Sequence, residues 1–239
     1  MDRQLITILF SLTLCSCNNS DKDKYASTQT SIDTLAIIKT FPLVCDTADI
    51  QGTNYIACSN ENQKLYVTNS SGDTVYKHFD LCNGAEFTDF DNDKNKDILF
   101  HYLTNVPDIY DLALFDAKSK TFKLVEKFNS FPAPVNIINT KYYYSYRRSG
   151  CADSNWDSDL FYISNFKAYC IGNIAGRDCD DVIADVGIFI SKIASDKIIP
   201  CDTFEIETIS KYKDDKWGFI ADYWTNNYKK FTGREKNGL

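Results

Sequence analysis

Short runs in which apolar and polar residues alternate recur along most of this chain, which is the pattern of β-strands that bury one face. Three of these runs carry a leucine at their second position: 64–69, 111–116 and 159–164. The three leucines are separated by 47 and 48 residues. A polar turn and a second apolar run come after each of them, an order typical of β-hairpins. The pattern therefore predicts a repeated antiparallel unit.

A further strand-like run precedes each hairpin, and a weaker fourth copy follows the third. The preceding runs are 54–58, 97–103, 141–147 and 186–193, and the fourth hairpin is expected from 203–209 and 217–224. Units of this length match the blade spacing of β-propellers. We therefore predict an all-β domain, a small propeller-like array of about four three-stranded units, with an irregular β-sandwich as the alternative.

The segment that starts at Trp217 has a second interpretation. Trp217, Ile220, Trp224 and Tyr228 lie near one face of a helix, so a C-terminal helix also fits the pattern. Gly218 disfavours that helix.

The start of the chain has the features of an export signal. Arg3 precedes an apolar run, 5–14, that is too short to remain as a membrane helix. The run leads into Leu-Cys-Ser-Cys at 14–17, which resembles a bacterial lipobox with small Ser16 before the acceptor, Cys17. We predict a signal peptide at 1–16, lipidation of Cys17 and membrane attachment through that lipid.

The remainder of the chain divides by composition. Residues 17–33 are polar and predict a flexible tether, 34–230 predict the all-β domain, and 231–239 form a polar tail. Asn18 follows the lipidated cysteine, and in this the chain resembles lipoproteins of the outer membrane. We therefore expect a lipid-anchored protein of the cell envelope, in the outer membrane, on either its periplasmic or its surface face. The net charge of −7 argues against nucleic acid as a partner.

Seven of the nine cysteines follow Cys17, and an oxidising envelope favours disulfides between them. Cys45 and Cys58 are the first expected pair, because their short separation suits neighbouring strands. A second pair is expected among Cys170, Cys179 and Cys201. The odd number leaves at least one thiol unpaired, and the absence of a CxxC spacing gives no support to a zinc or redox site.

The strongest chemical motif is an acidic segment at 89–98. Carboxylates at alternate positions converge when a tight loop curls around a hard cation, and calcium fits such oxygen ligands best. The candidate ligands are Asp89, Asp91, Asp93 and Asp97, with the carbonyl of Asn95. A solvated acidic turn without a metal is the alternative.

This segment resembles the calcium loops of integrin-type FG-GAP and VCBS repeats, which read Asp-x-Asp-x-Asp-Gly-x-x-Asp-hydrophobic. The resemblance implies a structural Ca²⁺ between the strands of a propeller blade. The chain departs from the pattern at Lys94, where the repeats have the glycine that a positive backbone φ favours. With 111–123 and the turn at 149–151, the loop is also similar to small periplasmic propeller-like inhibitors of cell-wall hydrolases, a resemblance that implies binding to an enzyme.

The segment 145–158 combines arginines, aromatic residues and acids around a glycine turn. Arg147, Arg148 and Trp156 are the candidate partner-binding residues, because arginine and aromatic side chains dominate recognition surfaces. Pairing of Arg147 with Asp153 or Asp157 and a disulfide at Cys151 would instead make the segment structural.

The sequence favours a binding protein over an enzyme. Its only histidines, His78 and His101, lie in no nucleophile or metal motif, so no catalytic residue is assigned. We expect a lipid-anchored envelope protein with a structural calcium loop that recognises a protein or glycan partner. An inhibitor of a cell-wall hydrolase is one alternative, and a glycan-active hydrolase using acids such as Asp180 and Asp181 is the other.

Overall fold

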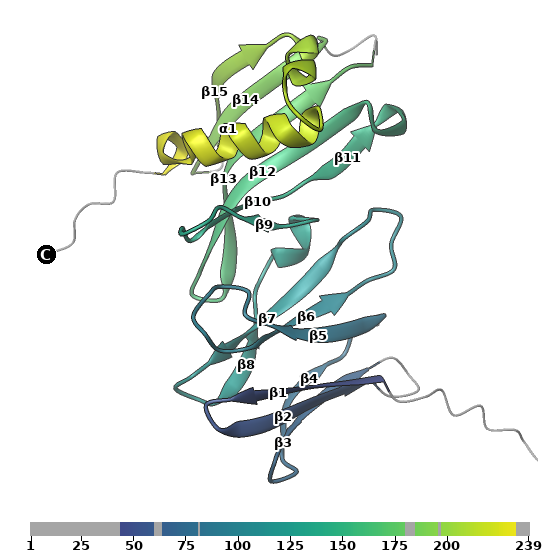
Figure 1. Ribbon diagram of the computed structural model, residues 1–239, viewed down its shortest axis with the longest axis vertical. Coiled ribbons are helices and arrows are strands. Elements are labelled where there is room, and N and C mark those ends of the chain that lie inside the picture. The colour runs from purple at the N-terminus through teal and green to yellow at the C-terminus, as the bar shows by residue number, and fades with distance from the viewer. Residues whose placement is uncertain (1–43, 60–63, 81, 180–184, 196, 233–239) are drawn as a thin grey trace, which may run out of the picture. The chain divides into compact units, whose positions relative to one another are not determined.

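The computed structural model describes residues 44–59, 64–80, 82–179, 185–195 and 197–232, all within one compact unit that spans residues 40–239. Fifteen strands, three short 3₁₀ helices and one α-helix make up the regular structure of these residues. The strands form three antiparallel sheets (Figure 1). The prediction of an all-β fold is confirmed.

The first sheet is a meander of four strands, β1-β2-β3-β4. Its strands are β1 (Val44–Ile50), β2 (Thr53–Ser59), β3 (Leu65–Asn69) and β4 (Thr74–His78). Cys45 lies directly opposite Cys58 in the β1–β2 register, and the two form a disulfide with a Cα–Cα distance of 4.2 Å. This pair confirms the prediction from their spacing.

The second sheet repeats this meander as β5-β6-β7-β8. Its strands are β5 (Gly84–Thr88), β6 (Asp97–His101), β7 (Tyr110–Asp116) and β8 (Thr121–Leu124). Residues of both meanders bury one another in a shared core that includes Tyr55, Val67 and Phe100. Each meander covers the apolar face of the other, as period-2 strands with one buried face require.

The third sheet is larger, with the order β15-β14-β13-β12-β10-β9 and β11 paired to β12. Its strands are β9 (Val135–Asn136), β10 (Tyr142–Tyr144), β11 (Arg147–Gly150), β12 (Asn155–Ser164), β13 (Lys167–Arg177), β14 (Gly187–Ala194) and β15 (Lys197–Phe204). A second core that includes Leu112, Phe128 and Phe161 joins this sheet to the second one. The 3₁₀ helices are η1 (Phe128–Ser130), η2 (Cys151–Asp153) and η3 (Ile206–Lys211).

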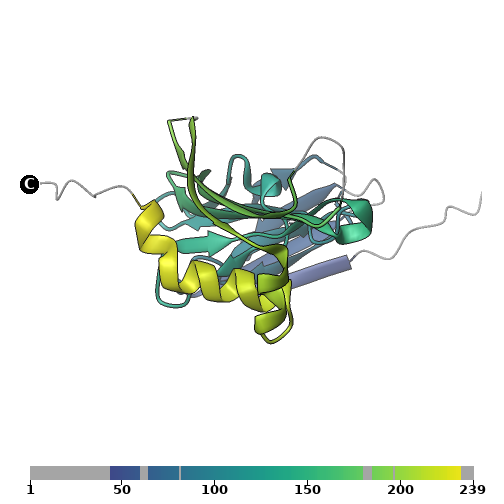
Figure 2. The same ribbon diagram turned by 90° about the horizontal axis from the view of Figure 1, so that it is seen from above.

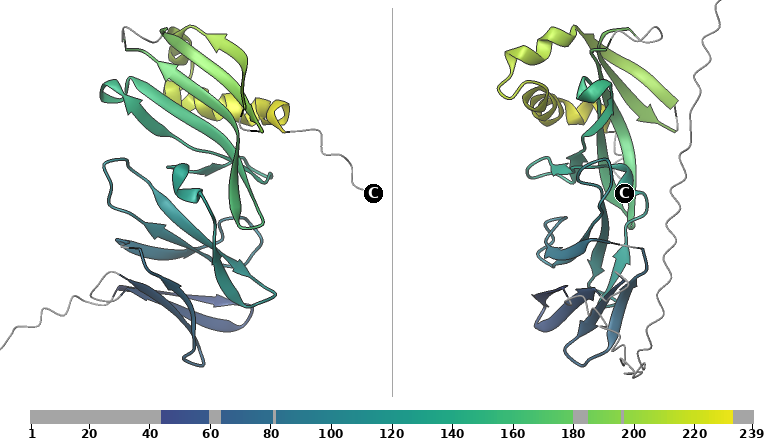
Figure 3. Two further views of the ribbon diagram at one scale, coloured as in Figure 1. Left: turned by 180° about the vertical axis from the view of Figure 1, so that it is seen from behind. Right: turned by 90° about the vertical axis from the view of Figure 1, so that its right-hand side faces the viewer.

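Helix α1 (Lys216–Phe231) covers one face of the third sheet, as Figures 2 and 3 show. Its buried residues, Phe219, Ile220, Tyr223, Trp224 and Phe231, follow helical spacing and pack on Trp156 and Ile174. The Nε1 of Trp224 donates a hydrogen bond to Ser158 Oγ at 2.9 Å, so the indole N–H is satisfied inside the core.

The prediction of four three-stranded units is wrong in two respects. Each of the first two units has four strands, and no fourth unit forms among the described residues, because β14 and β15 extend the third sheet. The expected strand at 203–209 ends at Phe204, and the expected strand at 217–224 lies in helix α1, the second interpretation of that segment. The sheets do not close into a propeller.

The second disulfide joins Cys151 to Cys179. A pair within Cys170, Cys179 and Cys201 does not form. Cys170 lies on β13 and Cys201 on β15, and β14 separates these strands. Strands two places apart lie about 9.6 Å from each other, farther than a disulfide can reach. Among the cysteines that the structure describes, three are outside the disulfides: Cys82, Cys170 and Cys201.

Candidate functional site

The acidic loop, defined here as residues 89–96, connects β5 to β6. Thr88 and Asp97 face each other in the β5–β6 register, so the two ends of the loop are held together by the sheet. Inside the loop, Asn92 and Lys94 adopt positive φ values of 63° and 77°. Lys94 thus has the left-handed backbone conformation expected at this position, which glycine adopts at the lowest steric cost.

Three carboxylates converge inside this loop. One oxygen each of Asp89, Asp91 and Asp93 lies within 4.8 Å of the others. The loop is closed by its own hydrogen bonds: the backbone N–H of Asp93 donates to Asp91 at 3.1 Å, and that of Asn95 donates to Asp93 at 2.7 Å. Partial burial raises the pKa of Asp91 above its ordinary value, and the charge of Asp93 raises it further.

The donor set fits a hard divalent cation. All three groups offer oxygen, the ligand that calcium prefers. The Oδ1 atom of Asp89 is buried and has no hydrogen-bond partner among the described residues. A buried carboxylate oxygen without a partner is costly, and a cation would remove that cost.

Asp97 and Asn95 have other contacts. Asp97 is 1 % exposed, and its two oxygens accept hydrogen bonds from the backbone N–H groups of Phe90 and Phe115, both at 2.9 Å. Burial raises its pKa to about 7. The side-chain amide of Asn95 donates to Asp93 at 2.9 Å and accepts from Gln51 at 3.0 Å. The structure thus groups Asp89, Asp91 and Asp93, whereas Asp97 anchors the loop to the sheet.

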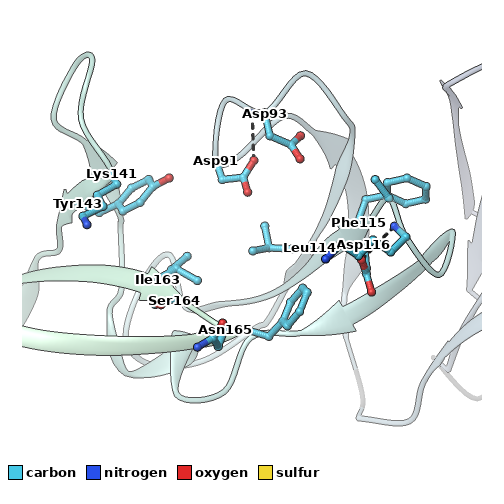
Figure 4. A pocket seen from close by; sticks show the side chains of 13 residues that line it. Asp91, Asp93, Leu114, Phe115, Asp116, Lys141, Tyr143, Ile163, Ser164 and Asn165 are labelled. Carbon is cyan, nitrogen blue, oxygen red and sulfur yellow. Dashed lines mark hydrogen bonds between the residues drawn. The ribbon is translucent and has the colours of Figure 1, made fainter. Parts of the chain in front are cut away.

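A cleft of about 510 Å³ adjoins the acidic loop. Figure 4 shows Asp91 and Asp93 on one side of it and Ile163 and Asn165 on the other. Tyr143 lines the cleft and donates a hydrogen bond to the carbonyl of Phe90 at 3.2 Å, which links the loop to the third sheet.

The three predicted partner-binding residues differ in their exposure and in their contacts. Arg147 is paired inside the protein, but its close partner is Asp159 at 2.6 Å, whereas Asp157, one of the two expected aspartates, lies at 3.9 Å. Arg148 remains on the surface, with 59 % of its side chain exposed and a longer contact of 3.9 Å to Asp153.

Trp156 requires a correction, because it is 1 % exposed and cannot offer its ring to a partner. It lies opposite Gly176 in the β12–β13 register, and it packs in the core beneath helix α1. Only glycine leaves room for this indole, since a Cβ on residue 176 would lie 2.1 Å from the ring.

The exposed tryptophan of this region is Trp217, which the sequence did not single out as a binding residue. Its side chain is 47 % exposed, and its ring lies 3.8 Å from the ring of Tyr146 between centroids. We name Tyr146, Arg148 and Trp217 the aromatic patch. These residues line a pocket of about 230 Å³, with Val106, Pro107, Asp108, Ala133, Arg147 and Asp153.

Several contacts hold the aromatic patch in place. Asp153 accepts a hydrogen bond from the Tyr146 hydroxyl and forms an ion pair with Lys216 at 2.9 Å. The disulfide of Cys151 fixes the same turn to Cys179. The sequence signal that could have located the patch is the run Lys216-Trp217 at the first turn of an amphipathic helix, once that helix is accepted.

Comparison with known proteins identifies no family. No family model matches the chain, and no curated protein matches it. Among solved structures, a protein described as related to a Xanthomonas type IV secretion system has 14 % sequence identity and a TM-score of 0.39, over 66 % of this chain and 85 % of that one.

The disulfides assign the chain to an oxidising compartment outside the cytoplasm. Within the described ranges, no helix combines the length and apolar character needed to cross a bilayer. The predicted signal peptide at 1–16, Cys17 and most of the predicted polar tail lie outside the described residues, as do Asp180 and Asp181.

Proposed function

We propose that this chain is a lipid-anchored binding protein of the cell envelope, attached to the outer membrane through Cys17, in which the acidic loop holds a structural Ca²⁺. Its aromatic patch recognises a protein or a glycan. The observation that carries the proposal is the half-exposed Trp217, held against Tyr146 beside the exposed Arg148. Aromatic and arginine side chains grouped in a pocket are the residues that contribute most to binding energy at interfaces.

The patch is ordered before any partner arrives. Asp153 fixes Tyr146 and Lys216, and a disulfide fixes the turn beside them. A partner therefore loses little free energy to the ordering of these side chains. Arg148 keeps a weak contact, so its guanidinium is available to a carboxylate or to the hydroxyls of a sugar.

Calcium has a structural role in this proposal. Asp89, Asp91 and Asp93 would hold the ion, which supplies positive charge to a group of carboxylates that otherwise repel one another. Fixing the loop keeps β5 and β6 in register and supports the contact from Tyr143 to the carbonyl of Phe90.

The calcium role is tested by the melting temperature of chelator-treated protein. Millimolar calcium should raise it, because a ligand that binds only the folded state stabilises that state. Magnesium should raise it less, and the double variant D91N/D93N should show no rise with either ion. An unchanged melting temperature in calcium would overturn this role.

The recognition role is tested with a double variant, R148A/W217A. Loss of both side chains should weaken partner binding more than tenfold and leave the melting temperature unchanged. The control is I138A, which removes an apolar side chain that is 82 % exposed and lies outside the patch. If the partner is a cell-wall hydrolase, the wild-type chain should inhibit it stoichiometrically; if it is a glycan, binding should be seen with isolated saccharides. Equal binding by wild type and R148A/W217A would reject the patch.

A further inference from the structure

A second group of metal-ligating side chains lies away from the acidic loop. His78 ends strand β4, Asp80 follows two residues later, and Asp111 lies on strand β7 of the second sheet. One ligand atom of each residue lies within 4.8 Å of the others. The group therefore brings together the end of the first sheet and the interior of the second.

The imidazole and one carboxylate of this group are inside the protein. His78 is 3 % exposed and stacks on Phe100 with a centroid distance of 4.1 Å, and Asp111 is 6 % exposed. The hydroxyl of Tyr102 donates to Asp111 at 2.6 Å and lies 2.8 Å from His78 Nε2. Asp80 is exposed and gives the group an opening to solvent.

Among the described residues, no lysine or arginine forms an ion pair with Asp80 or Asp111. The side chain of Asp111 instead accepts a hydrogen bond from the neutral hydroxyl of Tyr102. Buried carboxylates are normally paired with a cation or bound to a metal, so the missing charge points to a cationic ligand.

We propose that His78, Asp80 and Asp111 form a second divalent-metal site, selective for a transition metal such as zinc over calcium. One imidazole and two carboxylates are a donor set that zinc accepts, and water can complete the coordination. Calcium prefers oxygen alone, which distinguishes this site from the acidic loop. Metal bound here would connect β4 to β7 and so clamp the first sheet to the second. The proposal is independent of the aromatic patch.

The test is calorimetric titration of chelator-treated protein with zinc chloride in the presence of excess calcium, which occupies oxygen-only sites. Wild type should bind one zinc ion. H78Q and D80N should each weaken binding at least tenfold, because each removes one of the three ligands. Circular dichroism shows whether H78Q remains folded, and D80N, at an exposed position, keeps the test valid if it does not.

The matched control is H101Q, which removes the other histidine. His101 lies beside Glu86 at 3.6 Å and is outside the group. The variant H101Q should bind zinc with the same affinity as wild type. The proposal is overturned if wild type binds no zinc, if D80N and folded H78Q bind it unchanged, if H101Q loses it to the same extent, or if excess calcium displaces it.

Discussion

The carboxylate of Asp97, on strand β6, accepts a hydrogen bond from the backbone N–H of Phe115, on strand β7, at 2.9 Å. Its other oxygen accepts a hydrogen bond from the backbone N–H of Phe90, which lies in the acidic loop. One buried side chain thus ties the loop to the sheet on which it is built. This relation assigns Asp97 a role in stability that does not depend on a metal.

We expect D97A to lower the free energy of unfolding by about 2–4 kcal/mol in metal-free buffer, because it leaves two backbone N–H groups without their acceptor. Urea unfolding monitored by tryptophan fluorescence measures the change. D91N is the control, and it should change stability by less than about 0.5 kcal/mol, as substitutions of exposed side chains usually do. Equal losses in both variants would show that Asp97 has no special role.

Three of the four strands in each of the first two sheets were predictable because their information is local. Alternating runs separated by polar turns predict hairpins, and the hairpins of the first two sheets lie within a few residues of their expected positions. Cys45 and Cys58 face each other because the short connection between β1 and β2 fixes their register. The same local signal cannot show that β14 and β15 extend the third sheet instead of opening a fourth unit, because the alternation of their residues fits either arrangement.

Of the candidate sites, the loop conformation of the acidic segment could be predicted from the sequence, but the exposure of the two tryptophans could not. The acidic segment curls as its composition suggests, with Lys94 at positive φ. The burial of Trp156 was hidden because strand β12 is buried on both faces from Asn155 to Phe161, so alternation does not reveal which side chains reach the surface. Trp217 was hidden for the opposite reason, since its exposure depends on a helix that competed with a strand in the pattern.

Lys94 in the acidic loop provides a test of backbone strain. K94G should stabilise the protein by about 0.5–1 kcal/mol, because φ of 77° is unfavourable for a residue with a Cβ and ordinary for glycine. Urea unfolding measures the gain. N92G, at a φ of 63°, is the control and should gain less, since asparagine tolerates this region better than lysine. A loss of stability in K94G would show that the lysine side chain contributes more than the strain costs.

The three thiols should differ in reactivity. Cys201 is exposed, whereas burial raises the pKa of Cys170 to about 12 and also raises the pKa of Cys82. At pH 8 the thiolate fraction of Cys170 is then about 10⁻⁴, and only thiolate reacts with iodoacetamide. Mass spectrometry of briefly labelled protein should find the label on Cys201. Urea-unfolded protein is the control, in which all three should react, and early labelling of Cys170 in the folded protein would contradict the prediction.

Gly176 and Trp156 are predicted to depend on each other. G176A places a Cβ 2.1 Å from the indole, so we expect it to cost about 3 kcal/mol, at the upper end of overpacking effects. Replacing the indole by a smaller ring makes room, so the double variant G176A/W156F should lose less stability than the two single losses add up to. Additive losses in this double-mutant cycle, measured by urea unfolding, would show that the two residues are not coupled.

Asp153 should make the region around the aromatic patch sensitive to acid. Burial disfavours its charged form, but the hydrogen bonds from Tyr146 and Lys216 and the charges of Lys216 and Arg148 outweigh burial, and the pKa lies below its ordinary value. The unfolded chain therefore takes up a proton first as the pH falls. The stabilisation is complete above the unfolded pKa of about 4 and is lost as the pH falls toward the folded value.

We therefore expect stability to fall less steeply with acid in D153N than in wild type, measured by urea unfolding at pH values from 6 to 3. K216M should also have a shallower dependence, because it removes the ion pair at 2.9 Å. K213M is the control, since Lys213 lies on the exposed turn before helix α1 and has no part in the contacts of Asp153. If D153N and wild type lose stability in parallel, the acid sensitivity arises elsewhere, because a carboxyl can contribute to this slope only if its pKa changes on folding.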